Sequence, residues 1–211
     1  MAVSYGQAEF QAHFPVSQET MERLVTYRQL LAEASESMNL IGPKELDLFW
    51  SRHVLDSAQL LKFAPEAKRW VDLGAGAGFP GLVLASVLTD VAGAIVHLVE
   101  ATAKKARFLE TVTRELQLPA KVFNCRIEAF RAGEGPYDVV TARALAPLPR
   151  LIAYAKPILD RGAIGLFLKG ANLDAELAAA SDVLNGGAYR ADVLESLSDP
   201  RGRIVRVSKA A

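Results

Sequence analysis

The sequence predicts an α/β fold built on a mostly parallel sheet, and three observations support this prediction. From residue 69 onward, short apolar runs alternate with stretches of helical periodicity, which is the pattern of parallel strands joined by right-handed helical crossovers. The last two apolar runs have no helix between them, so they are expected to pair antiparallel. The 211 residues are 51% hydrophobic, which is enough for one well-packed core.

The first part of the chain is predicted to be helical. Residues 18–37 carry apolar side chains at near-helical spacing after Ser17, which is a good N-cap, and the pattern breaks at "NLIGP". A second helix is expected over about 44–62. We therefore divide the chain into an N-terminal helical extension, residues 1–66, and a compact unit of residues 67–211.

The compact unit is predicted to contain seven strands with helices on both faces of the sheet. The five crossover strands are expected at 69–73, 94–100, 120–125, 137–142 and 163–169. The helices that connect and follow them are expected at 81–88, 104–116, 148–159 and 173–184. The turn-rich segment "SDPRG" separates strands at 189–197 and 202–208, which suits a hairpin at a sheet edge.

Bulk composition limits the classes of function. Lys plus Arg and Asp plus Glu both number 24, so any nucleic-acid binding must use local basic patches. Cys125 is the only cysteine, which excludes an internal disulfide and a cysteine-based zinc site, and no metal is expected. The chain has no apolar run near 18 residues and no leader-like start, so we expect a cytoplasmic protein without a membrane segment. Nothing in the sequence demands more than a monomer.

A glycine-dense loop follows the first strand and suggests a ligand site. Gly74, Gly76 and Gly78 lie between strand and helix, where the backbone turns sharply and a ligand can approach its N–H groups. The run also satisfies G-x-G-x-x-G, the dinucleotide fingerprint, but that pattern alone is weak. Asp72 at the strand end would repel a pyrophosphate and suits a cationic donor. Glu100 ends the second strand, where a carboxylate can accept hydrogen bonds from ribose hydroxyls.

With "DLGAGAG" in view, the chain resembles the Rossmann-like S-adenosylmethionine-dependent methyltransferases, whose sheet also ends in an antiparallel strand. Five further segments narrow the resemblance to the ribosomal RNA small subunit methyltransferase G family, also called glucose-inhibited division protein B. These segments are "RHVLDS" at 52–57, "GFPG" at 78–81, "RIEAF" at 126–130, "TARALAPL" at 141–148 and "LKG" at 168–170. The likeness covers about residues 38–170. The family often has Asn-Leu-Thr where this chain has "NLIGP".

The resemblance implies a reaction and a set of site residues. Family members methylate N7 of one guanine, guanine-527, in 16S rRNA, with S-adenosylmethionine as donor and S-adenosylhomocysteine as product. The implied substrate is 16S rRNA in a small-subunit ribosomal particle. Combined with the loop argument, the cofactor-binding residues are expected to be Asp72, Gly74, Gly76, Phe79, Glu100, Ile127, Glu128 and Arg143.

The chemistry of the reaction predicts a site without a general base. Guanine N7 carries a lone pair and no proton, so attack on the methyl group depends on proximity and orientation. Arg143 and Lys169 follow strands at the carboxyl edge, where they are candidates for positioning the substrate. Exocyclic-amine methylation usually shows an Asp or Asn-Pro-Pro-aromatic run after the fourth strand, and this chain has "ARALAPLP" there. Cys125 is misplaced for C5 methylation.

Basic residues mark a candidate RNA surface. The expected RNA contacts are Arg52, His53, Arg143, Arg150, Lys169, Arg201 and Arg203. For His53, a local pair with Asp56 that shapes the helix is the alternative to an RNA contact, and proton transfer is not expected. Phe79 is the first candidate for an aromatic platform under an extruded base. A solvated basic face remains the alternative for the arginines and lysines.

Three other functions remain open on the residues alone. A methyltransferase for a small molecule or a protein has the same fold. An NAD-dependent oxidoreductase explains G-x-G-x-x-G but neither Asp72 nor the final hairpin. A non-catalytic module that senses the cofactor would bind the donor and transfer nothing.

Overall fold

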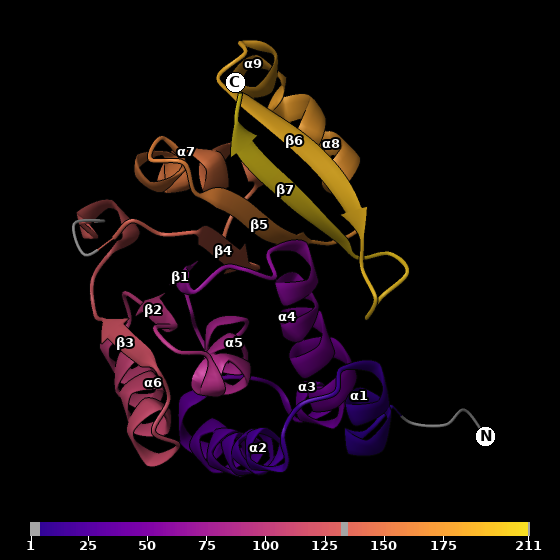
Figure 1. Cartoon of the computed structure of the whole chain (residues 1–211), viewed down its shortest axis with the longest axis vertical. Coiled ribbons are helices and arrows are strands. Elements are labelled where there is room, and N and C mark those ends of the chain that lie inside the picture. The colour runs from indigo at the N-terminus through magenta and orange to yellow at the C-terminus, as the bar shows by residue number, and fades with distance from the viewer. Residues whose placement is uncertain (1–4, 132–134, 211) are drawn as a thin grey trace.

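The computed structural model describes residues 5–131 and 135–210. It contains a seven-stranded sheet in the order β3-β2-β1-β4-β5-β7-β6. The strands are β1 (Arg69–Leu73), β2 (Ile95–Val99), β3 (Ala120–Phe123), β4 (Val139–Arg143), β5 (Ile164–Lys169), β6 (Tyr189–Glu195) and β7 (Arg203–Lys209). The first five are parallel, whereas β7 pairs antiparallel with both β5 and β6. The predicted mixed sheet with a C-terminal hairpin is confirmed, and Figure 1 shows this hairpin on the far side of β5.

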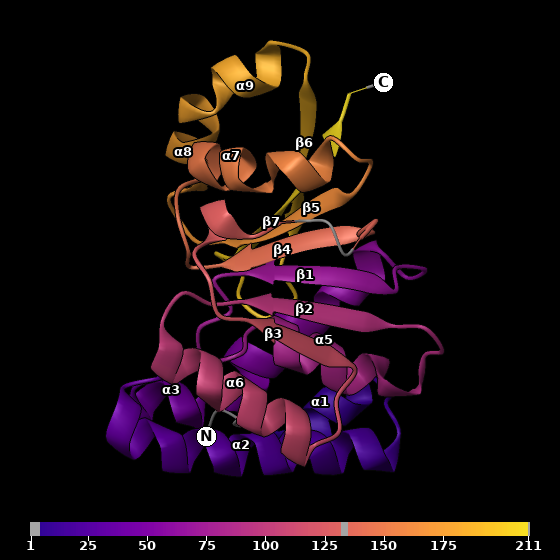
Figure 2. The ribbon, with the colours of Figure 1, turned by 90° about the vertical axis from the view of Figure 1, so that its left-hand side faces the viewer.

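Two groups of helices cover the two faces of the sheet, as expected (Figure 2). One core cluster joins Trp70, Leu98 and Leu166 of the sheet to the helices α2 (Gln18–Met38), α5 (Gly81–Val87) and α6 (Ala103–Glu115). The other cluster joins Val71, Val140 and Phe167 to α7 (Leu148–Leu159) and α8 (Leu173–Ala179). Neighbouring residues of β1 belong to different clusters because successive side chains of a strand point to opposite faces.

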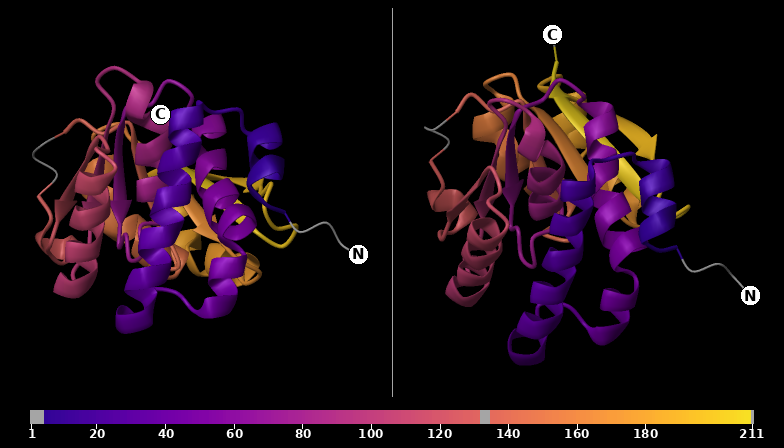
Figure 3. Two further views of the ribbon diagram at one scale, coloured as in Figure 1. Left: turned by 90° about the horizontal axis from the view of Figure 1, so that it is seen from below. Right: turned by 60° about the horizontal axis from the view of Figure 1, so that its bottom comes forward.

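The N-terminal helices belong to the first of these cores. Ser17 caps α2 by accepting a 3.2 Å hydrogen bond from the Thr20 N–H, as its residue type predicts. The buried face of α2 packs with Trp70 and Leu82 of the compact unit. Figure 3 shows the N-terminal helices lying side by side along one side of the sheet unit. The extension therefore completes the apolar core on that face.

Several elements differ from the sequence prediction. A short helix that was not expected, α1 (Gln7–His13), buries Phe10. The helix expected at 44–62 is a run of four pieces, namely α3 (Pro43–Asp47), the π-helix η1 (Phe49–Leu55), α4 (Asp56–Ala58) and the 3-10 helix η2 (Gln59–Phe63). The helix expected at 173–184 is divided into α8 and α9 (Ser181–Asn185). The remaining short elements are the 3-10 helices η3 (Leu88–Asp90) and η4 (Ile127–Ala129).

Candidate functional site

A cavity of about 490 Å³ lies at the carboxyl ends of β1, β2 and β4. Open α/β sheets bind their ligands at this edge, and the volume is within the usual range for a small-molecule site. Seven of the eight residues that the sequence assigned to a cofactor line this cavity together. They are Gly74, Gly76, Phe79, Glu100, Ile127, Glu128 and Arg143.

The glycine loop forms the floor of this cavity. Gly74 and Ala75 donate backbone hydrogen bonds to the carbonyl oxygen of Val99, which ties the loop to the end of β2. Gly76 has a φ of +58°, and a Cβ placed on it would meet only the Gly74 carbonyl, at 3.7 Å. A left-handed backbone with open space above it allows a ligand to approach the main chain closely.

Glu100 holds the loop from the next strand. It is 7% exposed, its Oε2 accepts a 2.9 Å hydrogen bond from the Gly76 N–H, and its Oε1 accepts one of 2.7 Å from the Thr102 N–H. Each carboxylate oxygen has a second lone pair, so two acceptor positions remain for hydroxyl groups in the cavity. The carboxylate is fixed in place before any ligand arrives.

Asp72 does not line the cavity. Its side chain is fully buried beneath the loop, where Oδ2 accepts a 2.9 Å hydrogen bond from the Gly81 N–H at the start of α5. The other oxygen, Oδ1, has no hydrogen-bond partner. Burial raises the pKa of this carboxyl to about 7, with a smaller contribution from the charge of Glu100 and opposing effects of the Gly81 hydrogen bond and Arg143. Asp72 therefore differs from the other expected cofactor residues, because its side chain is buried against the start of α5 and does not line the cavity.

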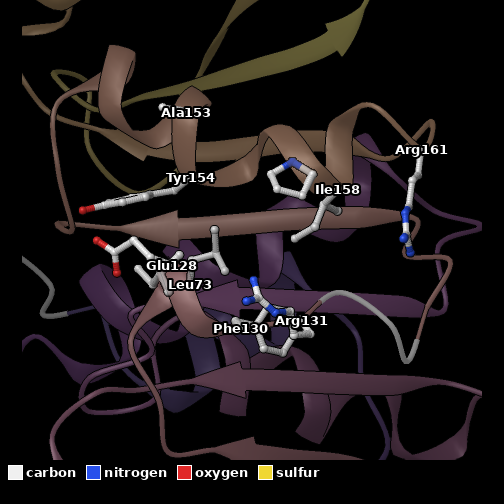
Figure 4. Close-up of a pocket in the computed structure, with 10 residues that line it drawn as sticks. Leu73, Glu128, Phe130, Arg131, Ala153, Tyr154, Ile158 and Arg161 are labelled. Carbon is white, nitrogen blue, oxygen red and sulfur yellow. The ribbon is translucent and has the colours of Figure 1, made fainter.

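The far end of the cavity is formed by η4 and α7. Ile127 and Glu128 line it from η4, and Tyr154 and Arg150 line it from α7. The Arg150 guanidinium donates to the Tyr154 hydroxyl at 2.7 Å and lies over its ring. Ile127, Glu128 and Tyr154 also line a neighbouring groove of about 390 Å³, which continues between η4 and α7. Figure 4 shows the Glu128 carboxylate and the Tyr154 hydroxyl together at one end of this groove.

Arg143, at the end of β4, is held by the N-terminal extension. Its Nη1 donates to the Arg52 carbonyl at 2.8 Å and lies 3.4 Å from Asp56 Oδ2, while its Nη2 donates to His53 Nδ1 at 2.6 Å. The guanidinium lies 5.3 Å from the centre of the Phe79 ring. Burial lowers the pKa of Arg143, but an arginine still keeps its charge at any physiological pH. The site therefore contains a fixed positive charge in a defined orientation.

His53 is a buried partner of Arg143 and not a surface contact. Its side chain is 1% exposed, and its ring stacks on Phe79 with the ring centres 4.4 Å apart. Burial, reinforced by the nearby Arg143 charge, lowers its pKa to about 3, so the imidazole is neutral and accepts through Nδ1. The expectation that His53 touches RNA does not agree with this burial. The predicted local pair between His53 and Asp56 is also replaced, because each of these residues binds the Arg143 guanidinium instead.

Phe79 offers no open aromatic face. The side chain is 6% exposed, with His53 stacked on it and Tyr27 and Phe49 in ring contact. The prediction of a stacking platform for a base is wrong for this arrangement, because the loop turns the ring toward the aromatic core of the extension. Phe79 lines the first cavity and packs against both His53 and Arg143.

A second cavity, of about 700 Å³, adjoins the first. Arg143, Ala144 and Leu145 line both, so they form the wall between them. The other walls come from the extension, from the segment after β5 and from the loop between β6 and β7. They include Glu45, Arg52, Asp56, Lys169, Gly170, Asn172, Glu176, Ser198 and Asp199. Three regions that are distant in the sequence thus meet at this cavity.

Lys169 reaches the second cavity, but its charge is already compensated. The side chain is 9% exposed, Nζ forms an ion pair with Glu176 Oε2 at 2.5 Å, and Nζ donates to the Ala146 carbonyl at 3.0 Å. The Glu176 carboxylate also accepts from the Leu148 N–H at 2.6 Å. The lysine therefore ties β5 to the start of α7 and α8, and this pairing disfavours the phosphate contact expected from sequence.

The other predicted basic residues lie nearer the surface. Arg52 is half exposed, with its guanidinium 3.8 Å from both Glu45 and Asp199 across the mouth of the second cavity. Arg201 is 80% exposed beside Asp199, and Arg203 donates to the carbonyls of Pro200 and Gly202. Arg150 borders the first cavity instead. The predicted set is therefore dispersed around two openings.

Sequence reasoning missed several residues at these cavities. Leu40 and Ile41 line the first cavity from the "NLIGP" break, and Glu45 lines the second. Asp56 appeared only as a neighbour of His53. Its position in a helical segment gives no signal for a partner 87 residues away at the end of β4. The turn at "NLIGP" was visible, but not the direction in which its side chains point.

Within residues 5–131 and 135–210, no group of three or more His, Cys, Asp or Glu side chains is arranged to hold a metal ion. In the same residues, no helix combines the length and the apolar character needed to cross a bilayer.

Comparisons with known protein sequences all identify the same family. A sequence model of the family described as rRNA small subunit methyltransferase G matches residues 20–202. A relative named ribosomal RNA small subunit methyltransferase G from Caulobacter vibrioides is 48% identical over 202 residues, covering 96% of this chain and 91% of that protein. A relative of the same name from Parvibaculum lavamentivorans is 46% identical, covering 94% and 87%.

Solved structures share the fold at low sequence identity. A SAM-dependent methyltransferase from Aquifex aeolicus superposes with a TM-score of 0.61 at 16% identity, covering 84% of this chain and 98% of that one. The cofactor-bound protein Rv0187 from MTB superposes with a TM-score of 0.63 at 16% identity, covering 97% and 96%. These two likenesses identify the fold as Rossmann-like.

Proposed function

The chain belongs to the rRNA small subunit methyltransferase G family, and on this premise we propose that it methylates N7 of a guanine, guanine-527, in 16S rRNA of the small ribosomal subunit. It is an S-adenosylmethionine-dependent rRNA methyltransferase. The target atom and its position, together with the roles of individual residues, are proposals. They rest on the two adjoining cavities and on the resemblance described above.

The residues of the first cavity suit S-adenosylmethionine, whose bound sulfonium supplies an electrophilic methyl group. Gly76 offers main-chain approach, Gly74 leaves room for the Leu145 side chain against the loop, and the Glu100 carboxylate has acceptor positions for the two ribose hydroxyls. Ile127 is positioned to pack on the adenine, with Glu128 near its amino group. Arg143 supplies the positive charge that a ligand carboxylate requires. Asp72 acts indirectly, by holding the start of α5 under the loop.

The observation that carries the proposal is the wall shared by the two cavities. Donor and acceptor must meet within a few ångströms for methyl transfer, so their binding sites must adjoin. Arg143, Ala144 and Leu145 border both cavities, and the second cavity is large enough for a nucleobase with its ribose. A base extruded from folded RNA would enter this second cavity.

The proposed chemistry needs positioning and no proton acceptor. Guanine N7 has a lone pair and no proton, so its alkylation leaves a cation and releases no proton from that atom. The one imidazole near the shared wall is buried, neutral and committed through Nδ1 to Arg143. We therefore assign His53 to the orientation of Arg143 and propose no catalytic general base among the described residues.

The proposed RNA surface consists of the exposed arginines around the two openings. Arg201 lies beside Asp199 at the second cavity, and Arg150 lines the first. Phosphate contacts by such residues fix the register of an RNA without reading its sequence. Because the formal net charge is zero, we propose a partly assembled small subunit in the cytoplasm as the substrate, with the enzyme acting as a monomer.

We also propose that residues 1–66 are an extension of the methyltransferase unit, residues 67–211, and not an independent domain. The side chains of Leu24 and Leu31 belong to the same apolar core as Trp70 and Leu82. Arg143 of the methyltransferase unit is bound by three residues of the extension. An extension that provides both core and site contacts has no reason to fold separately.

The experiment is tritiated methyl transfer from S-adenosylmethionine to small subunits from cells that lack the enzyme, followed by mass spectrometry of the rRNA nucleosides. The wild-type protein should yield 7-methylguanosine in 16S rRNA. Gly74→Ala and Arg143→Met should abolish transfer. Gly93→Ala and Arg107→Met are the matched controls. Gly93 also has a positive φ but lines neither of the two cavities, and Arg107 is an exposed arginine on α6.

Three outcomes would contradict the proposal. Retained activity in both cavity variants would contradict the site. Label in a protein or a small molecule, with none in rRNA, would contradict the substrate. Label at a different guanine atom would contradict only the assignment of N7.

A further inference from the structure

The second cavity contains one carboxylate that accepts no hydrogen bond from the described residues. Four carboxylates line it, and three accept hydrogen bonds from described residues. Asp56 accepts from Ser198 and Gln59, Glu176 accepts from Leu148, and Asp199 accepts from the Arg201 N–H. The Glu45 carboxylate lies near the Arg52 guanidinium and the neutral His53 ring, but it accepts no hydrogen bond from any residue that the structure describes. Its carboxylate is therefore available to a ligand.

Glu45 lies close to the wall between the cavities. Its Oε2 is 3.4 Å from His53 Nε2, and the opposite nitrogen of that ring is bound to Arg143. Because Nδ1 accepts from Arg143, the ring proton of neutral His53 is on Nε2, which faces Glu45. This buried nitrogen has no hydrogen-bond partner. Glu45 therefore lies directly beside the ring that orients Arg143.

The charges around Glu45 suit a neutral ligand with donors on one edge. Arg52 lies 3.8 Å from Glu45 on one side and 3.8 Å from Asp199 on the other, which is beyond hydrogen-bond distance in both cases. The arginine therefore balances the charge of the carboxylates while its own N–H groups remain available. The cavity thus presents an acceptor pair and a donor side by side.

The Watson–Crick edge of guanine matches this pair. Its N1–H and N2–H donors point in the same direction, and a carboxylate accepts both in parallel, while the neighbouring O6 accepts from a guanidinium. N7 lies next to O6 on the adjoining Hoogsteen edge, and none of these three contacts uses it, so it stays free for methylation. Adenine has an acceptor at N1, which a carboxylate repels. Enzymes that act on extruded bases recognise them by this edge.

We propose that Glu45 is the residue that selects guanine, by accepting hydrogen bonds from N1 and N2 of the target base, with Arg52 donating to O6. The inference rests on the proposed function, because it assumes that the second cavity receives the base. It adds a base-recognition site on the N-terminal extension, which acts before and apart from the chemistry at N7.

The test combines a variant of the enzyme with a variant of the base. Small subunits are reconstituted from 16S rRNA that carries either guanosine or inosine at the modified position. Inosine keeps N7, O6 and N1–H but lacks the 2-amino group. With the wild-type enzyme, inosine should lower kcat/KM for methyl transfer by about tenfold, as expected for the loss of one hydrogen bond to a charged group.

Glu45→Ala should remove that difference. Its kcat/KM should be at least tenfold below wild type on guanosine and nearly equal on guanosine and inosine. Binding of S-adenosylhomocysteine, measured by calorimetry, should not change. Asp47→Asn is the matched control, because Asp47 is an exposed acid on the same helix and does not line the cavity. It should keep the full preference for guanosine.

Each result has a defined meaning. If Glu45→Ala keeps the tenfold preference for guanosine, the inference is wrong. If Asp199→Asn loses the preference while Glu45→Ala retains it, the recognition belongs to the other carboxylate and the inference is again wrong. If the wild-type enzyme labels no rRNA at all, the proposed function itself fails. Thermal melting of each variant identifies any loss caused by misfolding.

Discussion

The buried carboxyl of Asp72 makes the stability of this protein depend on pH in an unusual direction. Asp72→Asn is the informative change, because the amide oxygen still accepts from the Gly81 N–H while the side chain no longer ionises. In the wild type, burial raises the pKa of Asp72 to about 7 from its ordinary value of 3.8. Between these two pKa values, the folded state therefore keeps a proton on Asp72, whereas the unfolded state has lost it.

The sign and size of the effect follow from proton linkage. Where the folded state binds more protons than the unfolded state, the free energy of unfolding falls as the pH rises. The fall begins near pH 4, and it ends above the folded pKa of about 7. From pH 5.5 to 8, the free energy of unfolding falls only over the part below the folded pKa, which is roughly 1.5 pH units. The expected fall in the free energy of unfolding is therefore about 2 kcal/mol.

Urea unfolding at pH 5.5 and pH 8 measures this difference. With a slope of about 2 kcal/mol per molar urea, the wild-type midpoint should fall by about 1 M more than the Asp72→Asn midpoint between the two pH values. His53 and Asp56 also have shifted pKa values, but both proteins contain them, so their effects cancel in the comparison. Parallel pH profiles for the two proteins would refute the reasoning.

Three further predictions concern the site. His53→Ala removes the acceptor of Arg143 Nη2, so the Kd of S-adenosylhomocysteine in calorimetry should rise about tenfold, with partial recovery in His53→Asn; an unchanged Kd in both would disprove the positioning role. Glu100→Ala leaves two N–H groups without an acceptor, which should lower the free energy of unfolding by about 2 kcal/mol or more and eliminate the thermal shift caused by S-adenosylhomocysteine. Lys169→Met should lower the free energy of unfolding by about 1–3 kcal/mol without changing the salt dependence of RNA binding. Arg150→Ala should instead lower the slope of log K for RNA binding against log salt concentration by about 1. If Lys169→Met lowers this slope and Arg150→Ala does not, Lys169 is a phosphate ligand after all.

The sequence predicted the sheet well, because its information is local. The crossover strands are short apolar runs bounded by turns, and their ends agree with the structure to within one or two residues. The glycine loop and Glu100 were also recognisable, since both follow directly from strand ends. The run after Pro43 was harder, because its apolar periodicity does not distinguish an α-helix from the mixture of α, π and 3-10 turns that is present.

The errors at the site come from contacts between distant segments. In the sequence, Lys169 looks like a basic residue without a partner, but the turn into α8 brings Glu176 into an ion pair with it. His53 resembles an exposed polar residue of a helix, whereas the end of β4 brings Arg143 against it across 90 residues. Phe79 was expected to have an open ring face, because the sequence does not show that Tyr27, Phe49 and His53 pack around it. A pattern of residue types contains no information on which distant side chain will cover it.

The π-helix η1 has a consequence for the length of the chain in this region. A π-turn contains one residue more than an α-turn, and such turns are frequent at functional sites. Deleting a single residue there changes the angular position of one side of the segment relative to the other, by about 100° if the remaining turns keep their geometry. The Arg52 carbonyl, His53 and Asp56 could then no longer meet the same guanidinium, even with every one of them retained. In this segment, the number of residues specifies the site as much as their identity does. A relative with an alignment gap here is therefore expected to have an altered site, even if every site residue is identical.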